Sequence, residues 1–308
     1  MERRYIEVEC WLYQLIMFPL SGINFFLNIF YIHCLISNRQ KLRQPLKLLL
    51  CFLIGCSATF SIHLALWSPI LVEMDGSSIP HHFFWMLIIF FTHSSMTCSG
   101  WMSIYAYVKV VPSKRALLIW IKRNIKSVVY LFFFSQETLI IFEASLKIST
   151  LVLDDTVFNK LPSHLIKLAK ATMIMNEVYF VICLFIMSLS SLSTAIYLSR
   201  HLRRMASKVR SCSLFRSQVR VTVTGILQGA LYVLLSTWIL SHYFFYDIAA
   251  GPAAYMTLAN ITVINVYMMG TIVNLGVGQA VFRQRAVDLW HRAARCCTTM
   301  RAQQPQKG

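Results

Sequence analysis

The chain has 308 residues, of which 57% are hydrophobic and 13% are charged, and its formal net charge is +17. A soluble domain carries about a quarter charged residues, so this composition excludes an ordinary water-soluble fold and favours a protein solvated by lipid. The basic residues stand in short segments between apolar runs and do not form one patch on a polar domain, which argues against nucleic acid as a partner.

Seven apolar runs are long enough to cross a bilayer, which takes about 20 mostly apolar residues per helix. In chain order they cover residues 13–36, 46–72, 83–108, 127–147, 174–198, 222–245 and 254–277. The sequence therefore predicts an all-α membrane protein, a seven-transmembrane-helix bundle. The whole chain, 1–308, is expected to be one receptor-like domain whose tail, 278–308, contains an amphipathic helix.

The distribution of Lys and Arg predicts the orientation of this bundle. Of the 29 basic residues, 23 lie in or next to the segments that follow the first, third and fifth runs, or in the tail. Cytoplasmic segments carry the excess of Lys and Arg in membrane proteins. We therefore expect an extracellular N-terminus, a cytoplasmic C-terminus and a place in the plasma membrane, with the first run as a signal anchor.

Seven spans, an outside N-terminus and short loops are typical of a seven-helix receptor. The alternative from another class is a small-solute transporter. Such transporters often show two related halves or helices broken by Gly and Pro, and no half-to-half similarity is evident here. No Cys, His or acidic cluster has metal-ligand spacing, and no Ser-His-Asp set or carboxylate pair stands out. We expect neither an enzyme nor a bound cofactor.

Four short motifs carry a resemblance to a receptor family. They are NIFYI (28–32), MSIYAYVKVVP (102–112), TAIYLSRHLRRM (194–205) and IVNLGVGQAV (272–281), each at the cytoplasmic end of a predicted span. With them the chain resembles the bitter taste receptors (type 2 taste receptors), as a divergent member. It departs from that family at Leu46, Cys56 and Val266, where the family carries polar residues. Vomeronasal type 1 receptors are the second family that fits.

The resemblance implies a G-protein-coupled chemosensory receptor, with a heterotrimeric G protein and small-molecule, bitter-type agonists as partners. The residues expected to contact the G protein or to switch with it lie near the cytoplasmic end: Tyr105, Lys109, Lys122, Leu198, His201, Arg204, Met205 and Asn274. His201 and Met205 are four residues apart and hence share one helical face. The arginines around them are explained equally well as topology anchors that reach the lipid head groups.

The agonist is expected in the outer half of the bundle. The candidate ligand-binding residues are Trp85, Ile88, Thr92, His93, Glu177, Trp238, Tyr243, Met256 and Ala259. Polar residues inside a span usually face the bundle interior, and the first three of this set follow helical spacing. The resemblance places Ile88 and Thr92 where that family presents side chains to ligands, and His93 where many of its members also carry His.

Each of these candidates has a second interpretation. His93 can make a structural hydrogen bond between helices, Glu177 can be a carboxylate that faces water, and aromatic residues at helical spacing can be packing. Glu137, in the fourth run, is given no role, because it either pairs with Gln136 or lies near the outer surface.

The tail contributes one more prediction. Cys296 and Cys297 follow a helix expected to lie on the inner leaflet, which makes them palmitoylation candidates. Free thiols are the alternative for both. The lipid bilayer is thus an expected partner, and a homo- or heterodimer is left open.

Overall fold

The fold is described from a computed structural model, which covers residues 2–37, 44–71, 79–111, 116–152, 163–206, 212–245 and 253–302. Within these ranges the chain forms eight helices and no strand. They are α1 (Glu2–Ser37), α2 (Leu46–Leu71), α3 (Ile79–Val110), α4 (Ala116–Val152), α6 (Ser163–Ala206), α7 (Cys212–Phe245), α8 (Ala253–Gly278) and α9 (Ala280–Ala302). The predicted all-α fold is confirmed for this part of the chain.

Six of the described helices are long and apolar enough to cross a membrane. Their apolar segments are Leu15–Ser37, Leu46–Trp67, Phe83–Lys109, Ile119–Leu146, Lys170–Tyr197 and Ala259–Gly278. The remaining predicted span, 222–245, falls in α7, whose described apolar stretch, Val223–Ile239, is shorter. The protein therefore has the several long apolar helices of a multi-pass membrane protein.

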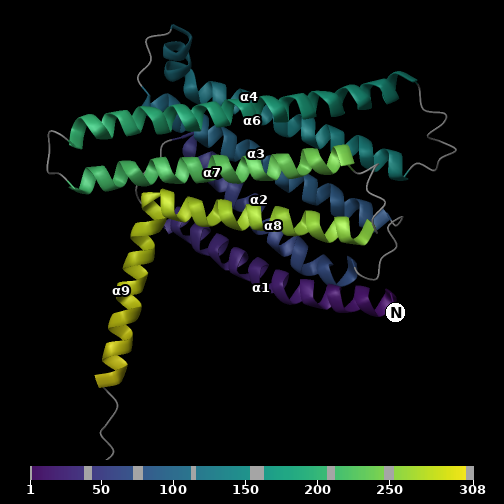
Figure 1. The fold of residues 1–308 in the computed structure, drawn as a ribbon, viewed down its shortest axis with the longest axis horizontal. Helices are drawn as coiled ribbons and strands as arrows, with labels where there is room; N and C mark the ends of the chain where they lie inside the picture. Colours follow the sequence, from purple (N-terminus) through teal and green to yellow (C-terminus); the bar gives the residue numbers. More distant parts are fainter. Residues whose placement is uncertain are drawn as a thin grey trace, which may run out of the picture.

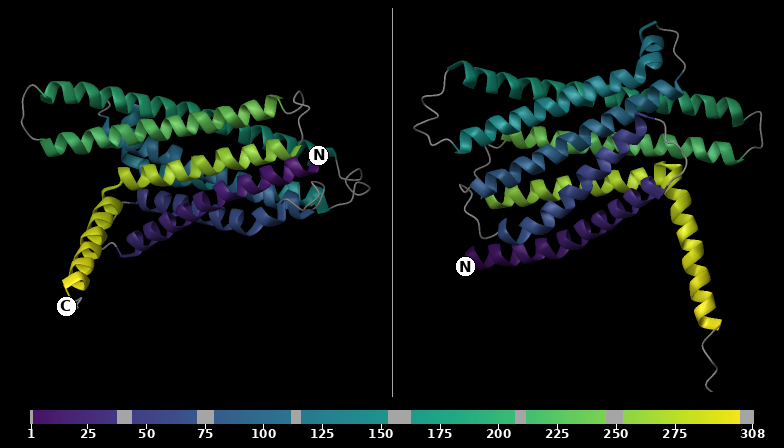
Figure 2. Two further views of the ribbon diagram at one scale, coloured as in Figure 1. Left: turned by 60° about the horizontal axis from the view of Figure 1, so that its bottom comes forward. Right: turned by 180° about the vertical axis from the view of Figure 1, so that it is seen from behind.

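The long helices lie side by side, and α9 leaves one end of the bundle at a steep angle (Figure 1). The N-terminus lies at the opposite end, as the two further views also show (Figure 2). We call these the α9 end and the N-terminal end. The central helix is α3, which contacts α2, α4, α6, α7 and α8, while α1 packs against α2 and α8. Helix α3 can therefore connect a site at one end with a site at the other.

Two helices extend beyond the predicted spans. Helix α4 begins at Ala116 because the amphipathic segment before the fourth apolar run joins it, with a kink at Asn124 (φ −107°, ψ 18°). Helix α6 begins at Ser163 and ends at Ala206, so it includes residues on both sides of its apolar run. Backbone hydrogen bonding continues a helix past the hydrocarbon wherever no breaker intervenes, and hydropathy alone does not mark that end.

The apolar core consists of two clusters. The cluster near the α9 end includes Leu53, Val129 and Phe133, each 0% exposed, and the other, nearer the N-terminal end, is built around Phe84 and Met268. Lipid is as apolar as leucine, so close packing and hydrogen bonds hold such helices together more than the hydrophobic effect does. Buried polar contacts inside this bundle are therefore informative about both stability and function.

Helix α9 is attached to the bundle at its first turns. The Phe282 ring is 1% exposed and its centroid lies 4.4 Å from that of Tyr31. Arg285 Nη2 donates a hydrogen bond to the Ser37 carbonyl oxygen over 3.0 Å. Farther along, Trp290 is exposed. An amphipathic helix held this way can lie along a membrane surface. The side chains of Cys296 and Cys297 lie outside the described residues.

Candidate functional site

A cavity of about 270 Å³ opens at the α9 end of the bundle. Side chains of α2, α3, α6, α7 and α8 line it, among them Ser99, Tyr105, Thr194, Gln228 and Asn274. Most of its lining residues are small or polar, in contrast to the two apolar clusters of the core. Polar groups within membrane helices are costly unless they are paired or line a functional surface, so this cavity is the first candidate for a site.

A hydrogen-bonded network around Gln228 forms the wall of this cavity. Gln228 Nε2 donates to Ser99 Oγ over 3.3 Å and to Thr271 Oγ1 over 3.1 Å. Asn274 Nδ2 donates to Gln228 Oε1 over 3.0 Å and to the Thr224 carbonyl oxygen over 2.8 Å. The network therefore joins α3, α7 and α8. Asn274 Oδ1 is buried and accepts no hydrogen bond from any described residue.

The predicted coupling residues are distributed unevenly about this cavity. Tyr105 and Asn274 line it, and Lys109 Nζ lies 5.8 Å from the centroid of the Tyr105 ring, one turn farther toward the α9 end. Lys122 is exposed on α4 and does not line the cavity. The others, on the last turns of α6, have side chains outside the described part of the chain: Leu198, His201, Arg204 and Met205.

The predicted ligand residues on α3 separate into two groups. Ile88 and Thr92 are buried, and Thr92 Oγ1 donates a hydrogen bond to the Ile88 carbonyl oxygen over 2.7 Å. Ile88 belongs to the apolar cluster around Phe84 and Met268, and the half-buried Trp85 packs against that cluster. His93 instead stacks on Phe180, with ring centroids 5.6 Å apart, and lines a small cavity of about 30 Å³. The cavity at His93 is where the structure brings a predicted residue into polar surroundings.

These polar surroundings come from α4 and α6. Gln136 Nε2 donates to Asn176 Oδ1, and Asn176 Nδ2 donates to Glu143 Oε2 over 2.7 Å. Asn176 and Glu143 line the same small cavity as His93. None of these three residues was predicted from the sequence to contact a ligand. Gln136 and Glu143 are seven apart inside an apolar run, hence on one helical face, and that spacing was the available signal.

Glu137 is buried between α3 and α4. Its Oε2 accepts a hydrogen bond from Ser94 Oγ over 2.7 Å, so its hydrogen-bond partner is on α3 and is not Gln136. The other carboxyl oxygen, Oε1, has no hydrogen-bond partner among the described residues. Neither of the positions considered from the sequence, beside Gln136 or near the outer surface, is the one observed.

The remaining candidates lie toward the N-terminal end. Glu177 is exposed, although its neighbour Asn176 is buried. Trp238 is 37% exposed, and its Nε1 donates to Asn260 Oδ1 over 2.8 Å, which joins α7 to α8. Ala259 is half-buried. The side chains of Tyr243 and Met256 lie outside the described residues.

A third polar group joins α1 to its neighbours. Asn24 Nδ2 donates to Ser61 Oγ over 2.9 Å, and Asn28 Nδ2 donates to Ser57 Oγ over 3.1 Å. Asn265 Nδ2 on α8 donates to Ser21 Oγ over 3.0 Å. These contacts lie away from the two cavities, and we regard them as structural.

Removing the Ser94 hydroxyl is expected to destabilise the fold. Ser94→Ala leaves Glu137 Oε2 without its donor, and an unsatisfied buried acceptor costs about 1–3 kcal/mol in the free energy of unfolding. In a Glu137→Leu background the same substitution should cost little, because no acceptor is left. Thermal unfolding of the unmodified chain, the two single variants and the double variant gives both costs. Equal costs in the two backgrounds would contradict the pairing. Thr59→Ala, at an exposed hydroxyl that donates to the Gly55 carbonyl oxygen of its own helix, is the control.

No protein-family model matches the chain, and no curated protein sequence matches it. The chemistry of the two cavities is therefore the basis for assigning a function.

Proposed function

We propose that this protein is a G-protein-coupled chemosensory receptor of the bitter taste type, with seven membrane crossings of which α7 is the sixth. In this proposal the N-terminal end is extracellular, the α9 end is cytoplasmic and the membrane is the plasma membrane. The observation that carries the proposal is the polar-walled cavity at the α9 end, bordered by α2, α3, α6, α7 and α8. Lys109, Lys122 and Lys126 are exposed toward this end of the bundle, and in the sequence most Lys and Arg residues lie in or next to the segments that follow α1, α3 and α6 or in the tail.

A G protein would use this cavity as a docking site for one of its helices. An amphipathic helix binds by laying one face into a groove, and a groove between several helices can widen when they move apart. The Asn274 Oδ1 acceptor in the wall and the exposed Lys109 at the rim provide polar contacts for such a partner. Cytoplasmic basic residues add electrostatic attraction.

The agonist would act in the other half of the bundle. Pockets for small organic ligands have volumes of about 300–1,000 Å³, and the cavity at His93 measures about 30 Å³. Ligand binding there therefore requires α3, α4 and α6 to separate. A ligand that binds the separated arrangement more tightly shifts the equilibrium toward it, which is a population shift.

Two ring contacts and one turn of α7 lead from the cavity at His93 to the network at the α9 end. His93 stacks on Phe180, whose ring centroid lies 6.0 Å from that of Tyr232. Tyr232 is one helical turn from Gln228 on α7, and Gln228 belongs to the network at the α9 end. A displacement of α6 by a ligand would thus move α7 at the place where the network holds it to α3 and α8.

Calcium release in cells that express the chain with a promiscuous Gα tests the proposal against a panel of bitter compounds. The decisive variant is Gly225→Leu. Gly225 lines the α9-end cavity, and a Cβ there would meet no atom within 4 Å, so a leucine side chain begins in open space and is expected to occupy part of the cavity. We expect at least a tenfold loss of maximal response at equal surface expression. Gly22→Leu, also in open space but on α1 and away from the cavity, should respond like the unmodified chain.

Two outcomes would count against this function. Equal responses of Gly225→Leu and Gly22→Leu would show that no G protein enters the cavity. A chain that reaches the surface and gives no Gα-dependent response across a broad panel would favour the transporter alternative, which solute-flux measurements in the same cells then test.

A further inference from the structure

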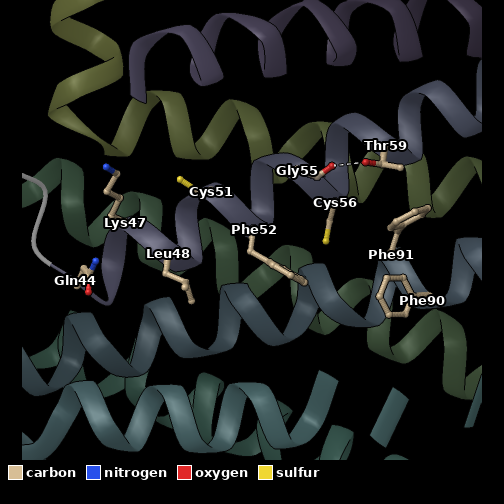
Figure 3. A pocket seen from close by; sticks show the side chains of 10 residues that line it. All are labelled: Gln44, Lys47, Leu48, Cys51, Phe52, Gly55, Cys56, Thr59, Phe90 and Phe91. Carbon is tan, nitrogen blue, oxygen red and sulfur yellow. Dashed lines mark hydrogen bonds between the residues drawn. The ribbon is translucent and has the colours of Figure 1, made fainter. Parts of the chain in front are cut away.

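We propose that a groove on the outside of α2 binds an anionic phospholipid, with one acyl chain in the groove and the head group at Lys47. The groove has a volume of about 690 Å³ and is lined by α2 and by Phe90 and Phe91 of α3, with Gln44 and Lys47 at one end (Figure 3). It shares no lining residue with the cavity at the α9 end, and it adjoins the small cavity at His93 through Phe90, which lines both.

Small side chains on one helical face create the hollow. Cys51, Gly55 and Thr59 repeat every four residues and therefore lie above one another along α2. A Cβ at Gly55 would meet no atom within 4 Å, so open space begins at the backbone itself. Phe52 and Phe90 contribute larger, apolar walls. A flexible hydrocarbon chain can lie along an apolar groove of this kind.

The length and polarity of the groove match one leaflet of a bilayer. From Lys47 to Thr59 the helix axis rises about 18 Å, at about 1.5 Å per residue. Half of a hydrocarbon core about 30 Å thick is of similar length. The exposed Lys47 and Gln44 stand at the α9 end, where the head groups would be, and the lining between them and Thr59 is largely apolar. A lysine at that depth attracts anionic head groups.

Charge also decides between a lipid and a second copy of the chain. In a two-fold dimer the same surface meets itself, so two parallel chains joined through this groove would place their Lys47 side chains at one depth and close together. Like charges brought together disfavour that contact. An anionic lipid neutralises Lys47 instead. Under the proposed orientation its leaflet is the cytoplasmic one, which carries most anionic lipid.

Photolabelling of the full chain in nanodiscs tests this proposal. The nanodiscs consist of phosphatidylcholine with a small fraction of phosphatidylserine that carries a diazirine on one acyl chain, and labelled residues are located by mass spectrometry. We expect labels on the groove residues of α2 and α3. The phosphatidylserine probe should label about fivefold more than the matched phosphatidylcholine probe, which corresponds to the ~1 kcal/mol that one lysine contributes near anionic lipid. Both leaflets have the same composition, so the result does not depend on the proposed orientation or on signalling.

Two pairs of variants make the test specific. Lys47→Gln should lower labelling by the phosphatidylserine probe to the phosphatidylcholine level, whereas Lys126→Gln, an exposed lysine near the same end of the bundle, should not. Gly55→Leu should abolish groove labelling by both probes, whereas Gly22→Leu should leave it unchanged. Equal labelling by the two probes with no effect of Lys47→Gln would overturn the proposal. Absence of labels from the groove residues, while other lipid-facing residues are labelled, would also overturn it.

Discussion

Alanine at Gly276 is expected to lower the free energy of unfolding by about 1–3 kcal/mol, the usual cost of overpacking a core. A Cβ at this position would lie 2.0 Å from the Tyr31 hydroxyl oxygen and 2.9 Å from Tyr31 Cζ. The Tyr31 ring has little room to move, because it is 5% exposed and packs against Phe282. At Gly276 the α8 backbone thus lies close against the Tyr31 side chain of α1, next to the attachment of α9. Thermal unfolding of the purified chain in nanodiscs measures the effect.

Two further variants show whether the clash with Tyr31 is the cause. Gly22→Ala adds the same methyl group in open space, and should be neutral or raise the free energy of unfolding by about 0.5–1 kcal/mol, the usual gain from Gly to Ala inside a helix. Tyr31→Phe removes the nearest atom, so it should restore part of the stability lost in Gly276→Ala. If Gly276→Ala unfolds at the same temperature as Gly22→Ala, the close approach of the two helices is wrong.

Leucine at Gln228 should destabilise the bundle by about 1–3 kcal/mol and raise signalling in the absence of agonist. The substitution removes the donor to Ser99 and Thr271 and the acceptor of Asn274, and leaves buried polar groups without partners. The second effect rests on the proposed function. If a G protein enters by separating α3, α7 and α8, weakening the network that joins them lowers the cost of that separation. Thermal unfolding and basal calcium release measure the two effects.

The control for Gln228→Leu lies on the same helix. Thr237 is exposed and bonds to the carbonyl oxygen of Val233 in its own helix, so Thr237→Ala should change neither measurement. Adding Asn274→Leu to Gln228→Leu should recover stability, because replacing both partners of a buried hydrogen bond by apolar groups can be nearly neutral. A destabilised Gln228→Leu chain with unchanged basal signalling would assign the network to stability alone.

The sequence by itself determined the helical fold and the positions of the apolar segments. An apolar run of about 20 residues can satisfy its backbone in lipid only as a helix, whatever its neighbours are, so this property is local. It also named His93 as a ligand candidate and Asn274 as a coupling candidate; the structure half-buries the first and buries the second, and their roles remain predictions. The number of crossings and their orientation rest on hydropathy and charge, and they remain predictions.

Only the tertiary structure decided which polar residues meet. Membrane helices are apolar on most of their surface, so the pattern alone specifies poorly how each helix is rotated. Asn176 and Glu177 are neighbours about 100° apart around α6, and the structure buries the first beside Glu143 and exposes the second. Glu137 pairs with Ser94, 43 residues away along the chain. Such partners depend on how the helices pack across the bundle, and no local pattern contains that information.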